Sequence, residues 1–121
     1  MPSLIRLPNG EPMQDFTILT PPADYDPHRA ASGTIIQEWL KDLGLPAHSR
    51  PMSFGALLSQ VKQRREFDTF ILGYGKLSLD PDYLRSFFHS KNNKKRGWNM
   101  SGYHNPDFDV AADASVAAVN K

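Results

Sequence analysis

Few residues of this sequence could do chemistry, and those that could do not form a catalytic set. No phosphate-binding loop and no GxSxG nucleophile motif is present. Gly73-Tyr74-Gly75 begins like a dinucleotide fingerprint, but Leu77-Ser78 stands where the third glycine should fall. The histidines are scattered, and none has a second metal ligand at a typical spacing. They are His28, His48, His89 and His104. We therefore expect a protein that is not an enzyme and that holds no metal and no cofactor.

A short segment rich in glycine supplies the best candidates for contact with a ligand. Glycine lets the backbone approach a ligand closely, and the ring of Tyr74 offers a flat face with a hydroxyl group. The wall of a ligand-binding cleft is therefore predicted at Gly73, Tyr74, Gly75, Lys76, Leu77 and Ser78. The alternative is that Tyr74 only fills the end of a sheet. Asn99 either joins the wall by bonding a ligand or fixes its own loop, and the sequence leaves both open.

One basic run, Lys91 to Arg96, is followed closely by Trp98. Such a run could contact phosphates while the indole stacks on a base. The alternative function is therefore a small α/β nucleic-acid-binding or regulatory domain that uses this loop. The net charge is only +1, whereas nucleic-acid-binding domains usually carry a larger clustered excess. We favour a solvated loop between two helices and expect no nucleic-acid partner.

The composition is that of an ordinary globular domain. Its 121 residues, 40% apolar and 22% charged, suffice for one domain and are too few for two full lobes. Cysteine is absent, which excludes disulfides and thiolate metal sites. Met1 to Arg6 lacks the pattern of a signal peptide. If the protein is exported, we expect this chain to be an internal piece of it.

Local signals predict alternating strands and helices. Strands are expected at residues 16–20, 47–52 and 67–72, and Asn9-Gly10 before them favours a hairpin turn. Helices are expected at 29–43, at 54–65, from Asp80 and from Asn105 to near the end of the chain. Gly44 and Pro46 end the first helix. Its predicted apolar stripe consists of Ile35, Ile36, Trp39, Leu40 and Leu43.

The alternation predicts an α/β fold with parallel strands joined by right-handed crossovers. Pro51 cannot donate a hydrogen bond, so the second strand should lie at an edge of the sheet. The expected strand order is 2-1-3, with helices flanking the sheet. In such sheets ligands bind beyond the carboxyl ends of the strands, here near Pro21-Pro22 and Gly73-Tyr74-Gly75.

Four ordered fragments carry a resemblance to a known family. They are Trp39 to Leu45, Phe67-Asp68 with Gly73-Tyr74, Asp80 to Phe88, and Asn99 to Asp109. Together they resemble the second lobe of family 5 solute-binding proteins, which serve ABC importers of dipeptides, oligopeptides and nickel complexes. The resemblance spans nearly the whole chain but only one lobe of a much longer protein.

The resemblance implies a periplasmic-binding-protein-like lobe made of residues 1–121, a fragment of the C-terminal ligand-binding lobe. It implies capture of a peptide or small solute between this lobe and a missing complementary lobe, by hinged closure. It also implies docking on an ABC permease. The expected location is periplasmic or extracellular, with membrane association through a lipid anchor outside these residues.

Two positions depart from the pattern of the peptide-binding members. These proteins place an Asp for the peptide amino terminus three residues after a Trp, and here the two positions are Leu77 and Tyr74. Leucine cannot pair with an ammonium group. Asp80 could replace that carboxylate, although we favour a helix-capping role for it. Lys62 stands near the place of an Arg that pairs the ligand carboxylate, and a solvated role is favoured for it.

Overall fold

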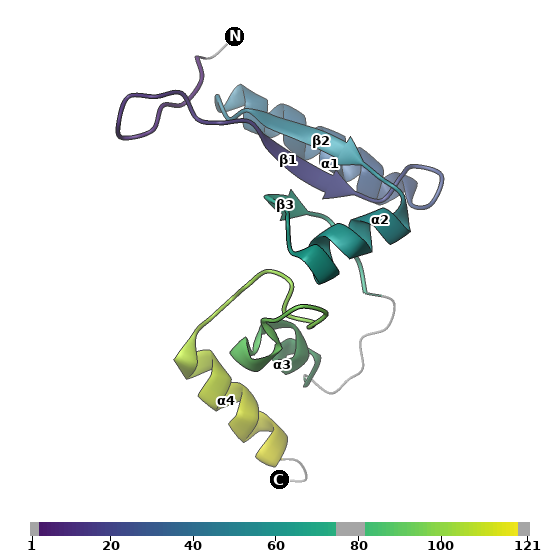
Figure 1. Ribbon diagram of the computed structural model, residues 1–121, viewed down its shortest axis with the longest axis vertical. Helices are drawn as coiled ribbons and strands as arrows, with labels where there is room; N and C mark the ends of the chain where they lie inside the picture. The colour runs from purple at the N-terminus through teal and green to yellow at the C-terminus, as the bar shows by residue number, and fades with distance from the viewer. Residues whose placement is uncertain (1–2, 75–81, 119–121) are drawn as a thin grey trace. The chain divides into compact units, whose positions relative to one another are not determined.

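The computed structural model describes residues 3–74 and 82–118 (Figure 1). Its strands are β1 (Phe16–Thr20), β2 (Ala47–Pro51) and β3 (Thr69–Phe70), and its α-helices are α1 (Pro27–Asp42), α2 (Phe54–Leu58), α3 (Asp82–Phe88) and α4 (Pro106–Ala117). The chain divides into two compact units. The first unit is Met1–Gln60 with Glu66–Gly73, and the second is Val61–Arg65 with Tyr74–Lys121.

A parallel three-stranded sheet forms the centre of the first unit, in the order β2-β1-β3. The predicted α/β class, the parallel strands and the 2-1-3 order are confirmed. Strand β2 lies at an edge, where the missing N–H of Pro51 costs no ladder hydrogen bond. The buried residues at the centre of this unit include Ile18, Leu19, Ala47 and Leu57.

Strand β3 is much shorter than the predicted strand at 67–72. At the start of β3, side chains make bonds that a longer ladder would make. The Asp68 carboxylate accepts the N–H of Thr17 at 3.0 Å, and the Thr69 hydroxyl donates to the Thr17 carbonyl at 2.9 Å. Both backbone groups of Thr17 are therefore satisfied without an additional residue of β3 in the ladder.

Helix α1 begins and ends at strong local signals. Asp26 caps its start by accepting the N–H of Arg29 at 3.0 Å, and Pro27 occupies the first turn. Just after its end, Gly44 has a φ of +85°, which glycine adopts without strain. The helix starts two residues before the predicted one, because Pro27 and His28 extend the first turn.

An apolar stripe on a helix is expected to be buried, and this expectation is wrong for three of the five stripe residues of α1. Ile35 is 48% exposed, and Trp39 and Leu43 are each 65% exposed. The buried residues of α1 are Ala30 and Gly33. A Cβ atom on Gly33 would lie only 2.6 Å from Cγ2 of Thr20. Small residues thus bring the helix close to the sheet, while Ile36 and Leu40 are half-buried and the other three apolar residues are exposed.

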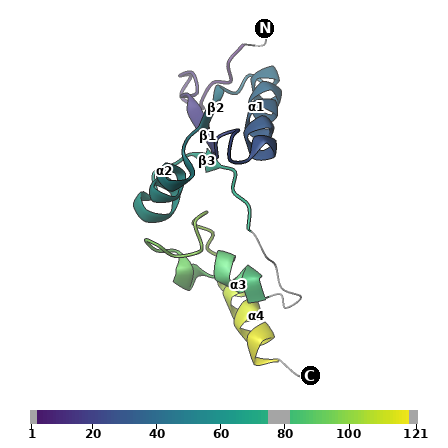
Figure 2. The same cartoon turned by 90° about the vertical axis from the view of Figure 1, so that its right-hand side faces the viewer.

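Other elements of the first unit follow the sequence signals closely. The predicted turn at Asn9-Gly10 forms, with an antiparallel bridge between Arg6 and Pro12 and a φ of +88° at Gly10. Ser53 caps α2 by accepting the N–H of Ala56 at 3.4 Å. Figure 2 shows α1 on one side of the strands and α2 on the other. The residues expected to continue α2 form a π-helix, Ser59–Arg64, in place of an α-helix.

The second unit is built around α3 and α4, which pack against each other (Figure 1). A short 3-10 helix, Ser90–Asn92, follows α3. Asn105 caps α4 as predicted, with its side-chain oxygen accepting the N–H of Asp107 at 2.9 Å and that of Phe108 at 3.2 Å. The predicted start signal Asp80-Pro81 lies outside the described residues. Helix α4 ends at Ala117.

Candidate ligand-binding site

The carboxyl edge of the sheet carries a charged side chain that the sequence analysis did not single out. Arg29, in the first turn of α1, forms an ion pair with Asp26 at 3.0 Å and keeps a third of its side chain exposed. Its guanidinium lies so close to Gly73 that any Cβ at that position would overlap it. A larger residue at position 73 would therefore displace the flexible end of the Arg29 side chain. The sequence could have indicated Arg29 as a site residue, because the connection after β1 places the start of α1 near the carboxyl end of that strand.

An exposed aromatic pair lies in the same unit. The rings of Tyr25 and Phe54 are stacked, with centroids 4.7 Å apart and planes inclined by 17°. Tyr25 precedes the cap of α1 and is 56% exposed, while Phe54 opens α2 just after β2. Both residues follow the carboxyl ends of strands, the position where ligands bind in open α/β sheets. The pair offers a flat apolar face there.

In the second unit Tyr74 packs on helix α3. Its ring stacks on Phe87 with centroids 4.1 Å apart, and 41% of the residue stays exposed. Partial burial raises the pKa of the Tyr74 hydroxyl above 10.0. The group is therefore protonated at neutral pH and can donate a hydrogen bond. Phe87 also contacts Trp98 edge to face, so Tyr74 belongs to a supported aromatic cluster.

Asn99 is fully buried, and its side chain is used inside its own loop. The amide nitrogen donates to the carbonyls of His89 at 3.1 Å and Tyr103 at 2.8 Å. The amide oxygen accepts the N–H of Tyr103 at 3.2 Å and the hydroxyl of Ser101 at 3.3 Å. Of the two roles left open by the sequence, these contacts favour the fixing of the loop.

Only two members of the predicted cleft wall fall in the described part of the chain. Gly73 ends the first unit and Tyr74 begins the second. The remaining members, Gly75, Lys76, Leu77 and Ser78, lie outside the described residues. The predicted wall from Gly73 to Ser78 therefore stays a prediction.

A network of charges joins α3 to α4 and accounts for the most buried histidine. His89 Nε2 lies 3.1 Å from Asp113, and its Nδ1 accepts the N–H of Lys91. Asp109 accepts the hydroxyl and the N–H of Ser90, and these bonds lower the pKa of its carboxyl. Across residues 3–74 and 82–118, no group of three or more His, Cys, Asp or Glu side chains could hold a metal ion. We therefore assign this network the structural role of holding α3 and the residues after it against α4.

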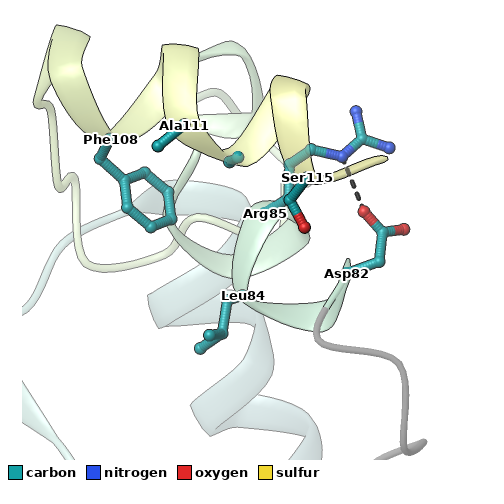
Figure 3. Close-up of a pocket in the computed structure, with 7 residues that line it drawn as sticks. Asp82, Leu84, Arg85, Phe108, Ala111 and Ser115 are labelled. Atoms are coloured by element: carbon teal, nitrogen blue, oxygen red, sulfur yellow. Dashed lines mark hydrogen bonds and ion pairs between the residues drawn. The ribbon is translucent and has the colours of Figure 1, made fainter. Parts of the chain in front are cut away.

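A small hollow of about 200 Å³ lies between α3 and α4 (Figure 3). Its walls are mostly apolar and include Leu84, Phe108 and Ala111. The two charged residues at its rim pair with each other, since Arg85 Nε lies 2.7 Å from the Asp82 carboxylate. The hollow is smaller than most ligand pockets, which start near 300 Å³. We therefore assign it no ligand.

Comparison with protein families and curated proteins gives no match, but solved structures match well. NikZ from Campylobacter jejuni, in complex with Ni(L-His), superposes on 92% of this chain with a TM-score of 0.71 and 22% identity. The oligopeptide-binding protein AppA from Bacillus subtilis, in complex with a nonapeptide, matches 88% with a TM-score of 0.75 and 28% identity. The periplasmic oligopeptide-binding protein of an ABC transporter from Thermotoga maritima matches 97% with a TM-score of 0.79 and 18% identity.

These matches show that the chain has the α/β fold found in part of periplasmic binding proteins, as the resemblance implied. The chain spans only about a fifth of each of them, between 20% and 23% of their length. A second structure of the Thermotoga protein has mannohexaose bound. The matched proteins are binding proteins, and their ligands belong to three chemical classes. None of the helices described for this chain is long and apolar enough to span a membrane.

Proposed function

We propose that this chain is part of the substrate-binding component of an ABC importer and helps to capture a peptide or similar small solute. The supporting observation is the match over 88% to 97% of the chain to solved binding proteins at TM-scores of 0.71 to 0.79. Four ordered sequence fragments point to the same family. In this proposal residues 1–121 belong to one lobe, and the complementary lobe is supplied by other residues.

The proposed cleft wall contains the segment from Gly73 to Ser78. Tyr74 contributes a half-exposed ring and a protonated hydroxyl. Within the first unit, the carboxyl edge of the sheet separately offers the exposed ring of Tyr25 and the partly exposed positive charge of Arg29 for contact with a ligand. Asn99 supports the wall indirectly. It holds the loop that carries Trp98, and the ring of Trp98 contacts Phe87, on which Tyr74 stacks.

The proposed ligand does not depend on a free peptide amino terminus. Peptide-binding members of the family hold that terminus with a carboxylate, and Leu77 stands at the corresponding position here. Rings such as those of Tyr25 and Tyr74 favour flat or apolar groups of a ligand. The fold itself leaves the ligand class open, since function depends on the site more than on the fold.

The remaining parts of the proposal concern partners and location. The loaded protein would dock on a membrane permease, and closure of the two lobes would precede this step. We place the protein in the periplasm or outside the cell, held at the membrane by a lipid anchor beyond these residues. Two of the matched structures are named as periplasmic proteins, which supports this location.

A chimera tests the proposal directly. This chain would replace the structurally equivalent segment of AppA, and circular dichroism would establish that the chimera folds. We expect the folded chimera to bind at least one of three probes in calorimetry: a nonapeptide, a nickel–histidine complex or mannohexaose. Substituting Tyr74→Ala should weaken that binding about tenfold, the effect of losing roughly 1.4 kcal/mol of aromatic contact. Tyr74→Phe should change it less, because the ring and its stacking on Phe87 remain.

Two results would count against the proposal. A chimera that does not fold, or one that folds and binds none of the three probes, means that the chain is not an equivalent part of such a protein. Equal affinities for the Tyr74→Ala chimera and its parent would remove Tyr74 from the wall. The isolated 121-residue chain should bind the same probes weakly or not at all, and tight binding by it would contradict the need for a second lobe.

A further inference from the structure

Two basic segments that are far apart in the sequence lie together in the second unit. The N–H of Arg96 donates to the carbonyl of Lys62 at 2.9 Å. The guanidinium of Arg65 donates to the side chain of Asn93 and, at 3.5 Å, to the carbonyl of Asn99. The end of the π-helix and the loop after α3 are therefore joined by direct hydrogen bonds.

These segments form what we call the basic surface, and it contains no acidic residue. Its members are Lys62, Arg64, Arg65, Lys91, Lys94, Lys95 and Arg96. Neither 61–65 nor 89–105 contains an Asp or Glu. Among the residues that the structure describes, the ion pairs of the second unit use only Arg85 and His89 as cations. None of the seven cations forms an ion pair among the described residues, although Glu66 directly follows Arg65 in the sequence.

An exposed tryptophan belongs to the same surface. Trp98 is 50% exposed, and the ammonium group of Lys62 lies 3.5 Å from the centroid of its ring. Tryptophan prefers the interface between water and lipid, where its ring is partly buried and its N–H stays wet. A half-exposed Trp among unpaired cations is therefore a fitting contact for lipid head groups.

We propose that the basic surface binds the anionic phospholipid head groups of a membrane. Each Lys or Arg near an anionic membrane surface strengthens binding, and the effect falls off within a Debye length. Because five of the seven cations are exposed on an open surface, an extended array of phosphates suits them better than one small anion. This contact is independent of ligand capture and would hold even if the proposed import function failed.

Nucleic acid is the less favoured partner for this surface. The same unit carries Asp107, Asp109 and Asp113 on α4, and the net charge of the whole chain is only +1. Domains that bind nucleic acid usually have a larger excess of positive charge. No nucleic-acid-binding motif accompanies the cluster.

Vesicle binding tests the proposal with the full 121-residue chain. Co-sedimentation would compare phosphatidylcholine vesicles with vesicles that also contain phosphatidylglycerol. We expect binding only to the anionic vesicles, and weaker binding as salt is added. The double substitution Lys94→Ser and Lys95→Ser should weaken binding about 25-fold, at roughly fivefold for each charge. A matched control, Lys41→Ser with Arg50→Ser, removes two exposed cations of the first unit and should leave binding unchanged.

A further variant, at Arg96, removes one charge and also relieves the backbone strain of a positive φ angle. Arg96 has a φ of +63°, a conformation that glycine adopts without strain. Arg96→Gly should therefore weaken vesicle binding about fivefold with no loss of folding. In a Trp39→Phe background, the fluorescence of Trp98 should shift to the blue with anionic vesicles only, because the ring leaves water.

Three outcomes would overturn the proposal. One is equal binding to neutral and anionic vesicles, which would mean that charge does not drive the contact. Another is equal loss of binding in the Lys94/Lys95 variant and in the Lys41/Arg50 control. The third is tighter binding to duplex DNA or RNA than to anionic vesicles, with the same residues required, which would assign the basic surface to nucleic acid.

Discussion

Replacing Asn99 by alanine removes the side chain that ties the loop before α4 to the end of α3. Three bonds to the backbone are lost: the amide nitrogen to His89 and Tyr103, and the Tyr103 N–H to the amide oxygen. At about 1 kcal/mol net for each bond, the loss is about 3 kcal/mol of unfolding free energy. The carbonyl of Tyr103 can turn to water because that residue is 42% exposed, whereas His89 is buried.

The measurement must report on the second unit alone, since two compact units need not unfold together. In a Trp39→Phe background, Trp98 is the single tryptophan and lies next to Asn99. Urea unfolding followed by its fluorescence gives the free energy of that unit. A unit of about 50 residues is stable by roughly 3 to 8 kcal/mol. Asn99→Ala should therefore leave it with roughly 0 to 5 kcal/mol of unfolding free energy.

Asn93→Ala is the matched control for this experiment. Asn93 is exposed in the same loop, and its side-chain oxygen accepts a bond from Arg65. We expect its loss to lower the free energy of unfolding by less than about 1 kcal/mol. An Asn99→Ala variant that is destabilised no more than Asn93→Ala would refute the structural role assigned to Asn99. It would also return the side chain to the candidates for ligand contact.

Two more predictions concern close packing and pH. Gly33→Ala should lower the free energy of unfolding of the first unit by about 1 to 3 kcal/mol in urea titrations, because an added Cβ would lie 2.6 Å from a methyl group of β1. Gly55→Ala, where the added methyl meets open space, should have no such cost, and equal effects of the two variants would contradict the close approach of α1 to the sheet. The folded-state pKa of Asp109 is lowered from 3.8 by its bonds with Ser90, so its contribution to stability is present above that value and disappears as the pH falls below it. Acid titration of Ser90→Ala should show a smaller loss of stability below pH 3.8, and a slope equal to that of the parent chain would contradict this assignment.

Local signals in the sequence predicted the elements whose ends are fixed by one or two residues. Pro51 placed β2 at the edge, Gly44 ended α1, and Asn105 began α4. Each of these effects depends on backbone geometry within a few residues, so it can be recognised without knowing the fold. The strand order followed from the edge position that Pro51 gives the second strand.

Features that depend on packing could not be predicted in the same way. Periodicity marked an apolar stripe on α1, but Gly33 and Ala30 decide which side of that helix approaches the sheet. A glycine adds nothing to a hydrophobic pattern, so the pattern selected the larger residues. The late start of β3 depends on Asp68, whose carboxylate bonds a residue 51 positions away in the sequence.

The basic surface is likewise a functional feature that could not be predicted from the sequence. The run from Lys91 to Arg96 and the cations from Lys62 to Arg65 each look like an ordinary solvated end of an element. The two segments are held together by the hydrogen bond from Arg96 to Lys62 and by the bond that the Arg65 guanidinium donates to the carbonyl of Asn99. Only the folded chain joins these two basic segments, and only then does the lack of ion pairs at their seven cations become significant.

For the proposed ligand capture, individual side chains say more about the class of ligand than the fold does. The matched structures hold a nickel–histidine complex, a nonapeptide and a mannohexaose, so the shared architecture selects none of these classes. Arg29 is already paired with Asp26 at 3.0 Å, and a ligand carboxylate would compete with that pair for the guanidinium. The rings of Tyr25 and Tyr74 have no such internal competitor for their exposed faces, and the hydroxyl of Tyr74 remains a neutral donor. In the proposed function, each of these exposed rings would therefore favour uncharged ligand groups with a flat or apolar face.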